Sequence, residues 1–432
     1  MRAARVLDAA AMRVPRHATL PDCVPPAWLR AIDSVGRAVL GRADIARPDA
    51  LVPEIARLSQ AYTRERGAGR TLAEAPRTGG ALAARLRFFL PRDLAKIGGP
   101  LDALHRAGAL PAAARDGTRA LRVLDLGAGL GATSLGTATW LRTHGLAPRG
   151  LELDAYDDDA RALSLLAALA RETQAGGLLA DVAVPTQVRV STRDLTREDA
   201  LPAGRFDLIL VGFALNELFA ALPPAEAVAR RAAWLTEVAT RLADDGALLV
   251  LEPALRDTSR ALQAVRDVLA ARDAAPFVAA PCLRAGPCPM LLAERDWCHA
   301  ALPLALPAPV AALAQGAGLR FEGLRYAYLV LRRMRGALHD GDPLTEDGAR
   351  LRIVGDPLES KGKTEWFACG EPGLVRLARL DRERSEANAS LDDAARGDVL
   401  ELAPLPLRPA PTDEPGGALR ARLGPDVAVR VR

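Results

Sequence analysis

The stretch LRVLDLGAGLG, Leu121–Gly131, decides the fold class of this 432-residue chain. Its apolar first half predicts a buried strand, and Gly127, Gly129 and Gly131 follow with the spacing G-x-G-x-G. Glycine lets a backbone turn tightly and approach a ligand closely. The next residues, GATSLGTATWLRTHG, predict a helix whose first amide groups are free to bind that ligand. The stretch therefore predicts a strand, a ligand-binding loop and a helix.

Strands and helices alternate on both sides of this loop. Further strands are predicted in LELDAYD, QVRVSTRDL, FDLILVGFAL and GALLVLEPA, and a terminal strand pair in LRFEGLRYAYLVLRRMRG. The helices between them are predicted in ARALSLLAALARE, AEAVARRAAWLTEVATRLADDG and DTSRALQAVRDVLAAR. This alternation predicts an α/β fold with a mostly parallel, doubly wound, Rossmann-like sheet.

Three regions are expected along the chain. Residues 1–115 have helical apolar spacing, most clearly in Ala27–Leu40, Asp49–Arg64 and Thr78–Ala107. Residues 116–335 hold the sheet, with an insertion at about 274–303 because one crossover helix needs fewer residues than lie there. Residues 336–432 are irregular, with short β-like runs, and predict a small β-rich C-terminal module with a flexible tail.

Composition limits the partners and the compartment. The net charge of +4 permits a nucleic-acid partner without requiring one. No run of about 18 apolar residues occurs, so we expect no membrane partner. The N-terminus has no secretory signal, and because the whole chain is rich in Ala and Arg, its arginines are better explained by an ordinary segment than by a mitochondrial transit peptide. We therefore expect the protein to lie in the cytoplasm of a bacterium, with the mitochondrial matrix as the alternative. We also expect it to be a monomer.

Acidic residues follow the first three strands of the predicted sheet. Asp125 precedes the glycine loop, where a carboxylate suits a cationic ligand such as S-adenosylmethionine better than a pyrophosphate. Asp157 ends the second strand, where it can accept both ribose hydroxyls. Asp194 follows the third strand, within reach of an adenine amino group. With the glycines, this array resembles class I methyltransferases; the alternative is that Asp157 only caps the next helix.

The fourth strand ends in VGFALNELF. Methyltransferases that act on base amines usually carry Asn or Asp, two prolines and an aromatic residue here. This chain has Asn216 and Glu217 instead, and we assign Asn216 to the cofactor pocket. No catalytic residue is identified, although methyl transfer can proceed by positioning alone.

Three of the five cysteines lie in PCLRAGPCPMLLAERDWCHA: Cys282, Cys288 and Cys298. Their spacing is looser than the C-x2-C or C-x4-C knuckles of zinc sites. An iron–sulfur cluster suits four thiolates on a looser loop, and Cys369 in EWFACGEPG is the fourth candidate. Zinc remains an alternative, and Cys23 is interpreted as an ordinary buried thiol.

GPCPM followed by DWCH resembles the signature of a methyltransferase-like family of the small ribosomal subunit, known from mitochondria and with bacterial relatives. Segments in the family's order include LSQAYTRERG, ARLRFFLPRDLAKI, LNELF, LEPALRDTS, YLVLRR, KGKTEWFACGEPG and RGDVLEL. This chain departs from the family at LRAG, where a His is frequent, at Ala300, where an aromatic residue is usual, and at Arg396, where Trp is common.

The resemblance implies a [4Fe–4S] cluster on Cys282, Cys288, Cys298 and Cys369. It also implies a pocket for S-adenosylmethionine, formed by Asp125, Gly127, Gly129, Gly131 and Asp157. The implied role is assembly or translation competence of the small ribosomal subunit, through contacts with its rRNA. Whether members of the family transfer a methyl group is left open.

Three functions remain after this reading: a non-catalytic ribosome-binding factor, an rRNA methyltransferase, and a small-molecule methyltransferase with a structural zinc site. For RNA, the candidate contacts are Arg325, Arg332, Arg333, Arg335, Lys361 and Lys363. The competing interpretation of these side chains is a solvated, charge-protected strand edge.

Overall fold

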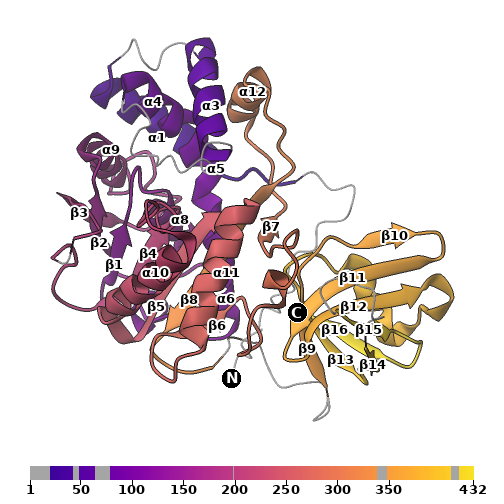
Figure 1. Ribbon diagram of the computed structural model, residues 1–432. Coiled ribbons are helices and arrows are strands. Elements are labelled where there is room, and N and C mark those ends of the chain that lie inside the picture. Colours follow the sequence, from indigo (N-terminus) through magenta and orange to yellow (C-terminus); the bar gives the residue numbers. More distant parts are fainter. Residues whose placement is uncertain are drawn as a thin grey trace, which may run out of the picture. The chain divides into compact units, whose positions relative to one another are not determined.

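The computed structural model describes residues 20–41, 48–63, 78–197, 199–336, 338, 348–409 and 418–432. The chain forms two compact units (Figure 1). One comprises Asp22–Gly341, and the other contains Asp342–Thr412 and Gly417–Arg432. The predicted arginine-rich N-terminal segment, residues 1–17, lies outside the described residues.

An eight-stranded sheet is the centre of the first unit, with the order β3-β2-β1-β4-β5-β8-β6 and β7 paired to β8. β1 to β5 are mutually parallel, whereas β6, β7 and β8 form antiparallel pairs. The strands are β1 (Leu121–Leu126), β2 (Leu151–Asp157), β3 (Thr186–Thr192), β4 (Phe206–Gly212), β5 (Leu242–Pro253), β6 (Phe277–Ala280), β7 (Ala300–Leu302) and β8 (Leu324–Arg332). This confirms the predicted α/β class, and its strand order and direction are those of a class I methyltransferase, Rossmann-like fold.

Helices cover both faces of this sheet (Figure 1). They are α8 (Ala132–Thr143), α9 (Ala160–Arg171), α10 (Pro224–Ala239) and α11 (Arg256–Ala270), whereas α12 (Ala308–Gly316) packs against the N-terminal helical region. Alternate residues of β1 enter different cores: Leu121 and Val123 pack in the core with α8 and α9, and Leu124 and Leu126 in the core with α10 and α11. This period of two, with both faces apolar, explains why β1 reads as a continuous apolar run.

The N-terminal helical region packs on the α8 side of the sheet. Its elements are α1 (Pro26–Val39), α3 (Pro48–Thr63), α4 (Gly79–Ala84), a π-helical turn η3 (Arg85–Phe89), α5 (Leu90–Asp93), a 3-10 turn η4 (Leu94–Ile97), α6 (Gly98–Arg106) and α7 (Ala112–Arg115). Gly136 of α8 lies against the carbonyl of Leu94, where a Cβ would clash. The absence of a side chain therefore lets η4 lie directly on α8.

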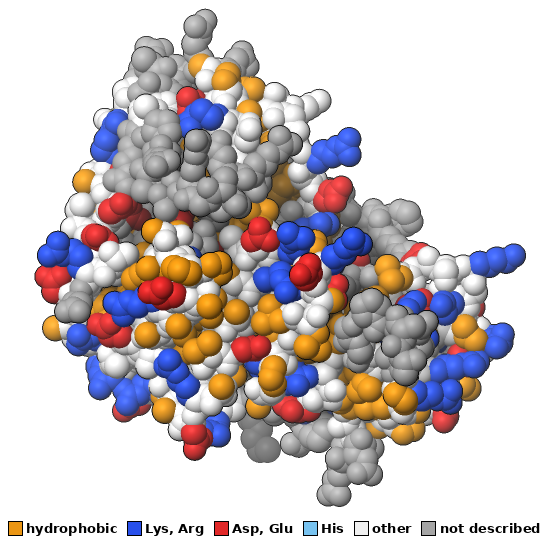
Figure 2. All heavy atoms as spheres, viewed as in Figure 1, with side chains coloured by type: hydrophobic (Ala, Val, Ile, Leu, Met, Phe, Trp, Pro, Cys, Tyr) orange, Lys and Arg blue, Asp and Glu red, His pale blue; other side chains and the backbone are white. Residues whose placement is uncertain are grey.

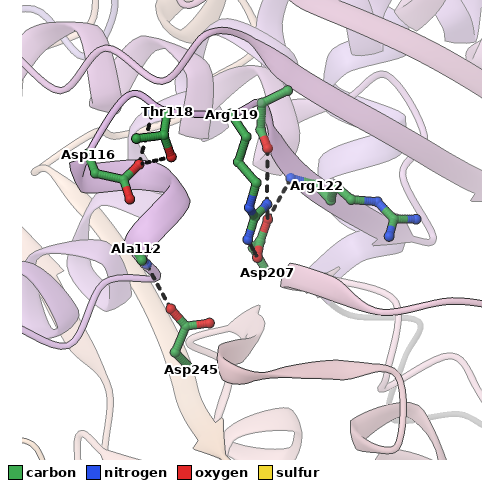
Figure 3. Close-up of polar contacts among 8 residues, drawn as sticks. Ala112, Asp116, Thr118, Arg119, Arg122, Asp207 and Asp245 are labelled. Atoms are coloured by element: carbon green, nitrogen blue, oxygen red, sulfur yellow. Dashed lines mark hydrogen bonds and ion pairs between the residues drawn. The ribbon is translucent and has the colours of Figure 1, made fainter.

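A buried carboxylate holds the end of the sheet at which the central strand β4 begins (Figure 3). Asp207 is 2% exposed and accepts two bonds from the Arg119 guanidinium, at 2.6 and 2.7 Å, and a third from the Arg122 amide at 2.9 Å. Asp245 accepts a 2.8 Å bond from the amide of Ala112. These bonds attach the end of the helical region and the start of β1 to the neighbouring strands.

The predicted strand pair at 319–336 is wrong. This segment contains one strand, β8, whose neighbours are β5 and two short strands, β6 and β7, that flank the cysteine-rich loop. The apolar run of β8 was recognisable, but its partners are distant in sequence and short. The 3-10 turn η5 (Pro289–Leu291) is the only helical element described between β6 and β7.

The second unit is also built on an eight-stranded sheet, of order β14-β15-β12-β11-β9-β13-β16, with β10 paired to β11. Its strands are β9 (Ala349–Ile353), β10 (Leu358–Ser360), β11 (Lys363–Gly370), β12 (Gly373–Leu380), β13 (Val399–Ala403), β14 (Leu407–Arg408), β15 (Leu419–Arg422) and β16 (Ala428–Val431), with 3-10 turns η6 (Asp381–Glu383) and η7 (Glu386–Asp393). Trp366 and Leu377 are among its core residues. The tail predicted to be flexible contributes β15 and β16, because its short apolar alternation pairs with β12 and β13.

Candidate functional site

A cavity of about 880 Å³ opens at the carboxyl ends of β1, β2 and β4. β1 and β4 are neighbours, and the chain leaves them toward opposite sides of the sheet, which is where ligands bind in doubly wound folds. The glycine loop, Asp157, Asp194 and Phe213 line one side. Residues of the helical region, including Tyr62, Arg85 and Lys96, line the other.

The glycine loop has a backbone that other residues would strain. Gly127, Gly129 and Gly131 have φ values of 77°, 51° and 81°. A Cβ on Gly127 would also collide with the side chain of Ala214, just beyond β4. Both the dihedral angles and the close approach therefore require glycine at this loop.

Asp125 lies beneath the loop and is fully buried, at 0% exposure. Its Oδ2 accepts a 2.8 Å bond from Thr133 Oγ1, but its Oδ1 has no hydrogen-bond partner within the described part of the chain. Burial raises the pKa of Asp125 to about 7, and the charge of Asp157 adds to this, while the bond from Thr133 and the hydroxyl and amide of Ser134 oppose it. A buried carboxylate left in this state is stabilised by an external cation.

Asp157 and Asp194 differ in how firmly they are held. Asp157 accepts bonds from the amides of Gly129 at 2.9 Å and Asp159 at 2.8 Å, so its carboxylate braces the loop that it faces. Burial raises the pKa of Asp157, and the two backbone hydrogen bonds lower it by a smaller amount. Asp194 is exposed and accepts bonds from Thr196, which lower its pKa. Both line the cavity and keep lone pairs for ribose or adenine donors.

Asn216 lies behind the cavity wall rather than on it. Its amide nitrogen donates a 3.0 Å bond to Glu252, and its side chain bonds both Glu252 and the carbonyl of Phe213. Arg231 donates to the carbonyls of Asn216 and Leu218 at 2.7 and 2.9 Å. This network fixes the loop after β4. The acidic residue of that loop that lines the cavity is Glu217.

The wall opposite the loop was missed by the sequence analysis. Arg92, Asp93 and Lys96 lie on α5 and η4, just after the π-helical turn that carries Arg85 and Phe89. Arg85 pairs with Asp159 at 2.9 Å and lies over Gly129. The available signal was the segment RFFLPRDLAKIGG, which combines charges with an otherwise apolar run; π-helical turns are frequent at functional sites.

Phe213, the residue directly after β4, has φ 63°, in the left-handed region that bulky residues rarely adopt. Its amide is bonded to the carbonyl of Leu251 at 2.7 Å, and its ring faces Lys96 Nζ at 4.7 Å from the centroid. Such strain costs of the order of 1–3 kcal/mol and persists where the surroundings enforce it, commonly at functional sites.

Cys282, Cys288 and Cys298 lie on the loop between β6 and β7. Burial raises the pKa of Cys288 to about 12, and the charges of Cys282 and Cys298 add to the shift, so the three thiols are close enough to influence one another. Within the described ranges, however, no group of three or more His, Cys, Asp or Glu is arranged to hold a metal ion. The donor set suits a thiophilic centre, but the expected cluster or zinc site is not established by this arrangement.

Helix α11 organises the cysteine loop. Arg260 donates to the carbonyls of Met290, Ala293 and Asp296 at 2.7 to 2.9 Å. Asp267 accepts the amide of Cys288, at 3.0 and 2.9 Å. The loop therefore has a defined conformation through side chains that are not cysteines.

Cys369 is in the other unit, on β11, opposite Leu374 of β12 and Arg352 of β9. Cys23 is buried and donates to the carbonyl of Pro91 at 3.4 Å, as expected for an ordinary thiol. None of the five cysteines, all of them in described segments, forms a disulfide.

The arginines expected to contact RNA are largely engaged within the protein. Arg325 pairs with Glu322 at 3.4 Å, Arg333 with Asp244 at 3.5 Å, and Arg335 with Asp273. Arg332 contacts the sulfur of Met334 at 4.0 Å, and Lys363 pairs with Glu365 at 2.9 Å, whereas Lys361 is exposed. Figure 2 shows cationic and acidic side chains interspersed on one face of the molecule. These pairings place most of the charges within the protein, although β8, which carries Arg325 and Arg332, is not an edge strand because β5 pairs on one side of it and β6 and β7 on the other.

A family model described as mitochondrial small ribosomal subunit Rsm22 matches residues 110–400, which is more than half of the chain. The chain belongs to this family. In the Rsm22-family chain, the match includes the glycine loop and all four candidate cysteine ligands. No curated protein matches the chain.

Solved structures similar to the Rsm22-family chain include three methyltransferases. A putative class I S-adenosylmethionine-dependent methyltransferase from Listeria monocytogenes is 12% identical, covering 74% of this chain and 90% of its own, with a TM-score of 0.33. A putative RNA methyltransferase from Pyrococcus horikoshii is 13% identical, covering 60% and 84%, with a TM-score of 0.29. Magnesium protoporphyrin IX methyltransferase from Synechocystis PCC 6803, with bound cofactor, is 16% identical, covering 56% and 84%, with a TM-score of 0.25. No inference about chemistry follows from these likenesses.

Proposed function

We propose that this protein is an S-adenosylmethionine-binding factor that acts on the small ribosomal subunit, in its assembly or as an rRNA methyltransferase. One observation carries the cofactor assignment: a strained glycine loop borders an 880 Å³ cavity whose lining includes acidic residues at the end of β2 and after β3. Family membership supports the ribosomal part.

The cofactor would lie across the carboxyl ends of the strands. Asp157 would accept hydrogen bonds from the ribose hydroxyls, and Asp194 would accept one from the adenine amino group. The backbone amides of the glycine loop would lie directly against the cofactor. Asp125 would act from below, through its charge, on the cationic part. When bound, S-adenosylmethionine supplies an electrophilic methyl group, and the protein's own part is to orient it and exclude water.

Isothermal titration of the purified protein with S-adenosylmethionine tests the pocket. Gly127→Arg should abolish binding, because the side chain would enter the contact with Ala214. Gly145→Arg is the matched control, since Gly145 also has positive φ, 67°, but open space around its Cβ position. Equal affinity in both variants would contradict the pocket assignment.

Methyl transfer from labelled cofactor to small-subunit RNA decides between the two ribosomal roles. Label above the Gly127→Arg background indicates an rRNA methyltransferase, and none indicates an assembly factor. Failure to co-sediment with small subunits would instead favour a small-molecule methyltransferase with structural zinc. A monomer is expected and is checked by light scattering.

We also infer that the cysteine loop holds a [4Fe–4S] cluster, with Cys369 as the fourth ligand that the family resemblance implies. The presence of three cysteines on one loop supports the inference, since thiolates are the usual cluster ligands. Protein purified without oxygen should be brown and contain iron and sulfide; a colourless protein with stoichiometric zinc would establish the alternative. Cys288→Ser should lose the iron and Cys23→Ser should keep it, and iron retained in Cys369→Ser would disprove the fourth ligand.

The compartment is also a proposal. The family description supports the mitochondrial alternative over the cytoplasm of a bacterium. No helix in the described segments is long and apolar enough to cross a membrane. Imaging the tagged full-length chain in its own cell separates the two compartments.

A further inference from the structure

Three charged side chains form a cluster in the cavity wall opposite the glycine loop; Lys96 is buried, and Arg92 and Asp93 are partly buried. Arg92 grips Asp93 with two bonds, Nε to Oδ1 at 2.7 Å and Nη2 to Oδ2 at 3.0 Å. Lys96 Nζ lies 2.9 Å from the same Oδ1, and Lys96 is only 7% exposed. All three line the cavity.

The cluster has more positive than negative charge. It contains two cations and one carboxylate, and Asp93 is already satisfied by the bidentate contact with Arg92. Burial lowers the pKa of Lys96, Arg92 adds to this shift, and Asp93 is the carboxylate that opposes it. A net positive charge away from water is unfavourable unless an anion joins it. The cavity side of Lys96 is therefore suited to an anionic group.

The other cations on the cavity have partners of their own. Arg85 is paired with Asp159, and Arg325 with Glu322. Arg193 donates to the carbonyl of Asp199 at 3.1 Å and lies over the ring of Tyr156. Lys96 is distinct because it shares a carboxylate that a guanidinium already occupies.

The residue type also points to Lys96. Of the 57 basic residues in the chain, only three are lysines: Lys96, Lys361 and Lys363. A chain that otherwise uses arginine retains an ammonium at this buried position. A compact ammonium with three rotatable donors can hold Asp93 and a second acceptor within a small space.

The position of Lys96 in the fold indicates which anionic group would bind it. Its Nζ is over the ring of Phe213, and the next residue, Ala214, lies against Gly127 of the loop. Asp194 and Asp157 lie beyond β3 and β2, so a cofactor that places adenine and ribose there extends its amino-acid part over β1 toward β4. The α-carboxylate is the only anionic group of S-adenosylmethionine.

We propose that Lys96 binds the α-carboxylate of S-adenosylmethionine at the β4 end of the cavity. This rests on the proposed cofactor function. The packing of Leu94 against Gly136 holds η4, and with it Lys96, directly on helix α8.

Calorimetric titration with two ligands tests the proposal without turnover. Decarboxylated S-adenosylmethionine keeps the sulfonium and the ammonium and lacks only the carboxylate. The wild-type protein should bind the intact cofactor at least about tenfold more tightly, as expected for a charged hydrogen bond. Equal affinity for the two ligands would overturn the proposal, and this comparison needs no variant.

Lys96→Met should remove that preference by weakening only the intact cofactor. The variant should fold, because Arg92 still satisfies Asp93. Arg325→Met, a cation on the same cavity, should keep the preference. Equal weakening of both ligands in Lys96→Met would mean that Lys96 has only a structural role. Loss of RNA binding with unchanged cofactor affinity would mean that Lys96 binds an RNA phosphate instead of the cofactor carboxylate. Either result overturns the proposal. If the wild-type protein binds neither ligand, the proposed cofactor function itself fails.

Discussion

Two buried aspartates lie at opposite ends of the neighbouring strands β1 and β4, and their surroundings differ. Asp207, at the start of β4, accepts three hydrogen bonds, two of them from a guanidinium (Figure 3). Asp125, at the end of β1, is equally buried but has no guanidinium partner: Thr133 donates to its Oδ2, the hydroxyl and amide of Ser134 also lower its pKa, and its Oδ1 has no partner within hydrogen-bond distance among the described residues.

The difference separates a structural end of the sheet from a binding end. At the start of β4, charge and hydrogen bonding balance within the protein. At the end of β1, a carboxylate lacks a cation, and across the cavity Lys96 shares its one carboxylate, Asp93, with Arg92. S-adenosylmethionine carries both kinds of charge, so one ligand could complete both groups.

The largest expected effect is a pH dependence of stability caused by Asp125. Its pKa is raised from 3.8 to about 7 in the folded protein, so folding favours the protonated form. The contribution is fully present below the unfolded value and is lost as pH rises through about 7, by up to about 4 kcal/mol. Urea unfolding without cofactor should show this loss in the wild type but not in Asp125→Asn. The same slope in both proteins would contradict the burial of an ionisable Asp125.

Asp207→Asn should destabilise the protein by about 3 kcal/mol, because it removes a buried ion pair and leaves donors unsatisfied. Denaturant unfolding measures the change. Asp116→Asn is the control, since Asp116 is an exposed carboxylate in the same region that bonds only Thr118 (Figure 3). Equal losses in the two variants would show that the Asp207 network contributes little.

Cofactor affinity should respond in the opposite order. Asp125→Asn should weaken S-adenosylmethionine binding about tenfold at a pH above the pKa of Asp125, because the negative charge beneath the sulfonium and ammonium is lost. Asp207→Asn should leave the Kd unchanged. A larger effect of Asp207→Asn on the Kd would remove the distinction between the two ends.

The smallest expected effects concern Asp157 and Asp194. Asp157→Asn should weaken binding by about fivefold and Asp194→Asn by about twofold, since charge-assisted bonds are weaker at exposed sites. Asp157 is half-buried and fixed by the amides of Gly129 and Asp159, while Asp194 is exposed. Titration calorimetry of both variants measures the two effects. The reverse order would mean that the adenine contact dominates.

Much of the sheet was predictable because β1, β4 and β5 are local apolar runs and β2 and β3 alternate apolar and polar residues. β8 was only partly predictable, since its partners β6 and β7 are short and lie more than forty and twenty residues away respectively. The tail that forms β15 and β16 was misjudged because its Pro and Gly content obscures two short alternating runs.

For the candidate site, the glycines and Asp157 were recognisable, as both follow strands whose ends share one edge. Asn216 was recognised by its position after β4, but its side chain turns to Glu252, a contact across 36 residues that no local pattern contains. Lys96 was not recognised, because the excess positive charge of the cluster that it forms with Arg92 and Asp93 exists only in the folded cavity wall.

The sequence by itself determined the α/β class, the glycine loop and the membership of the cysteines in one loop, since these depend on local spacing and on backbone freedom at named residues. The tertiary structure decided which carboxylates are balanced. Asp125 and Asp207 have the same side chain on adjacent strands, and only the groups brought to each by folding make one a brace and the other a candidate ligand-binding group. Charge balance is a property of neighbours in space, and the order of residues along the chain does not contain it.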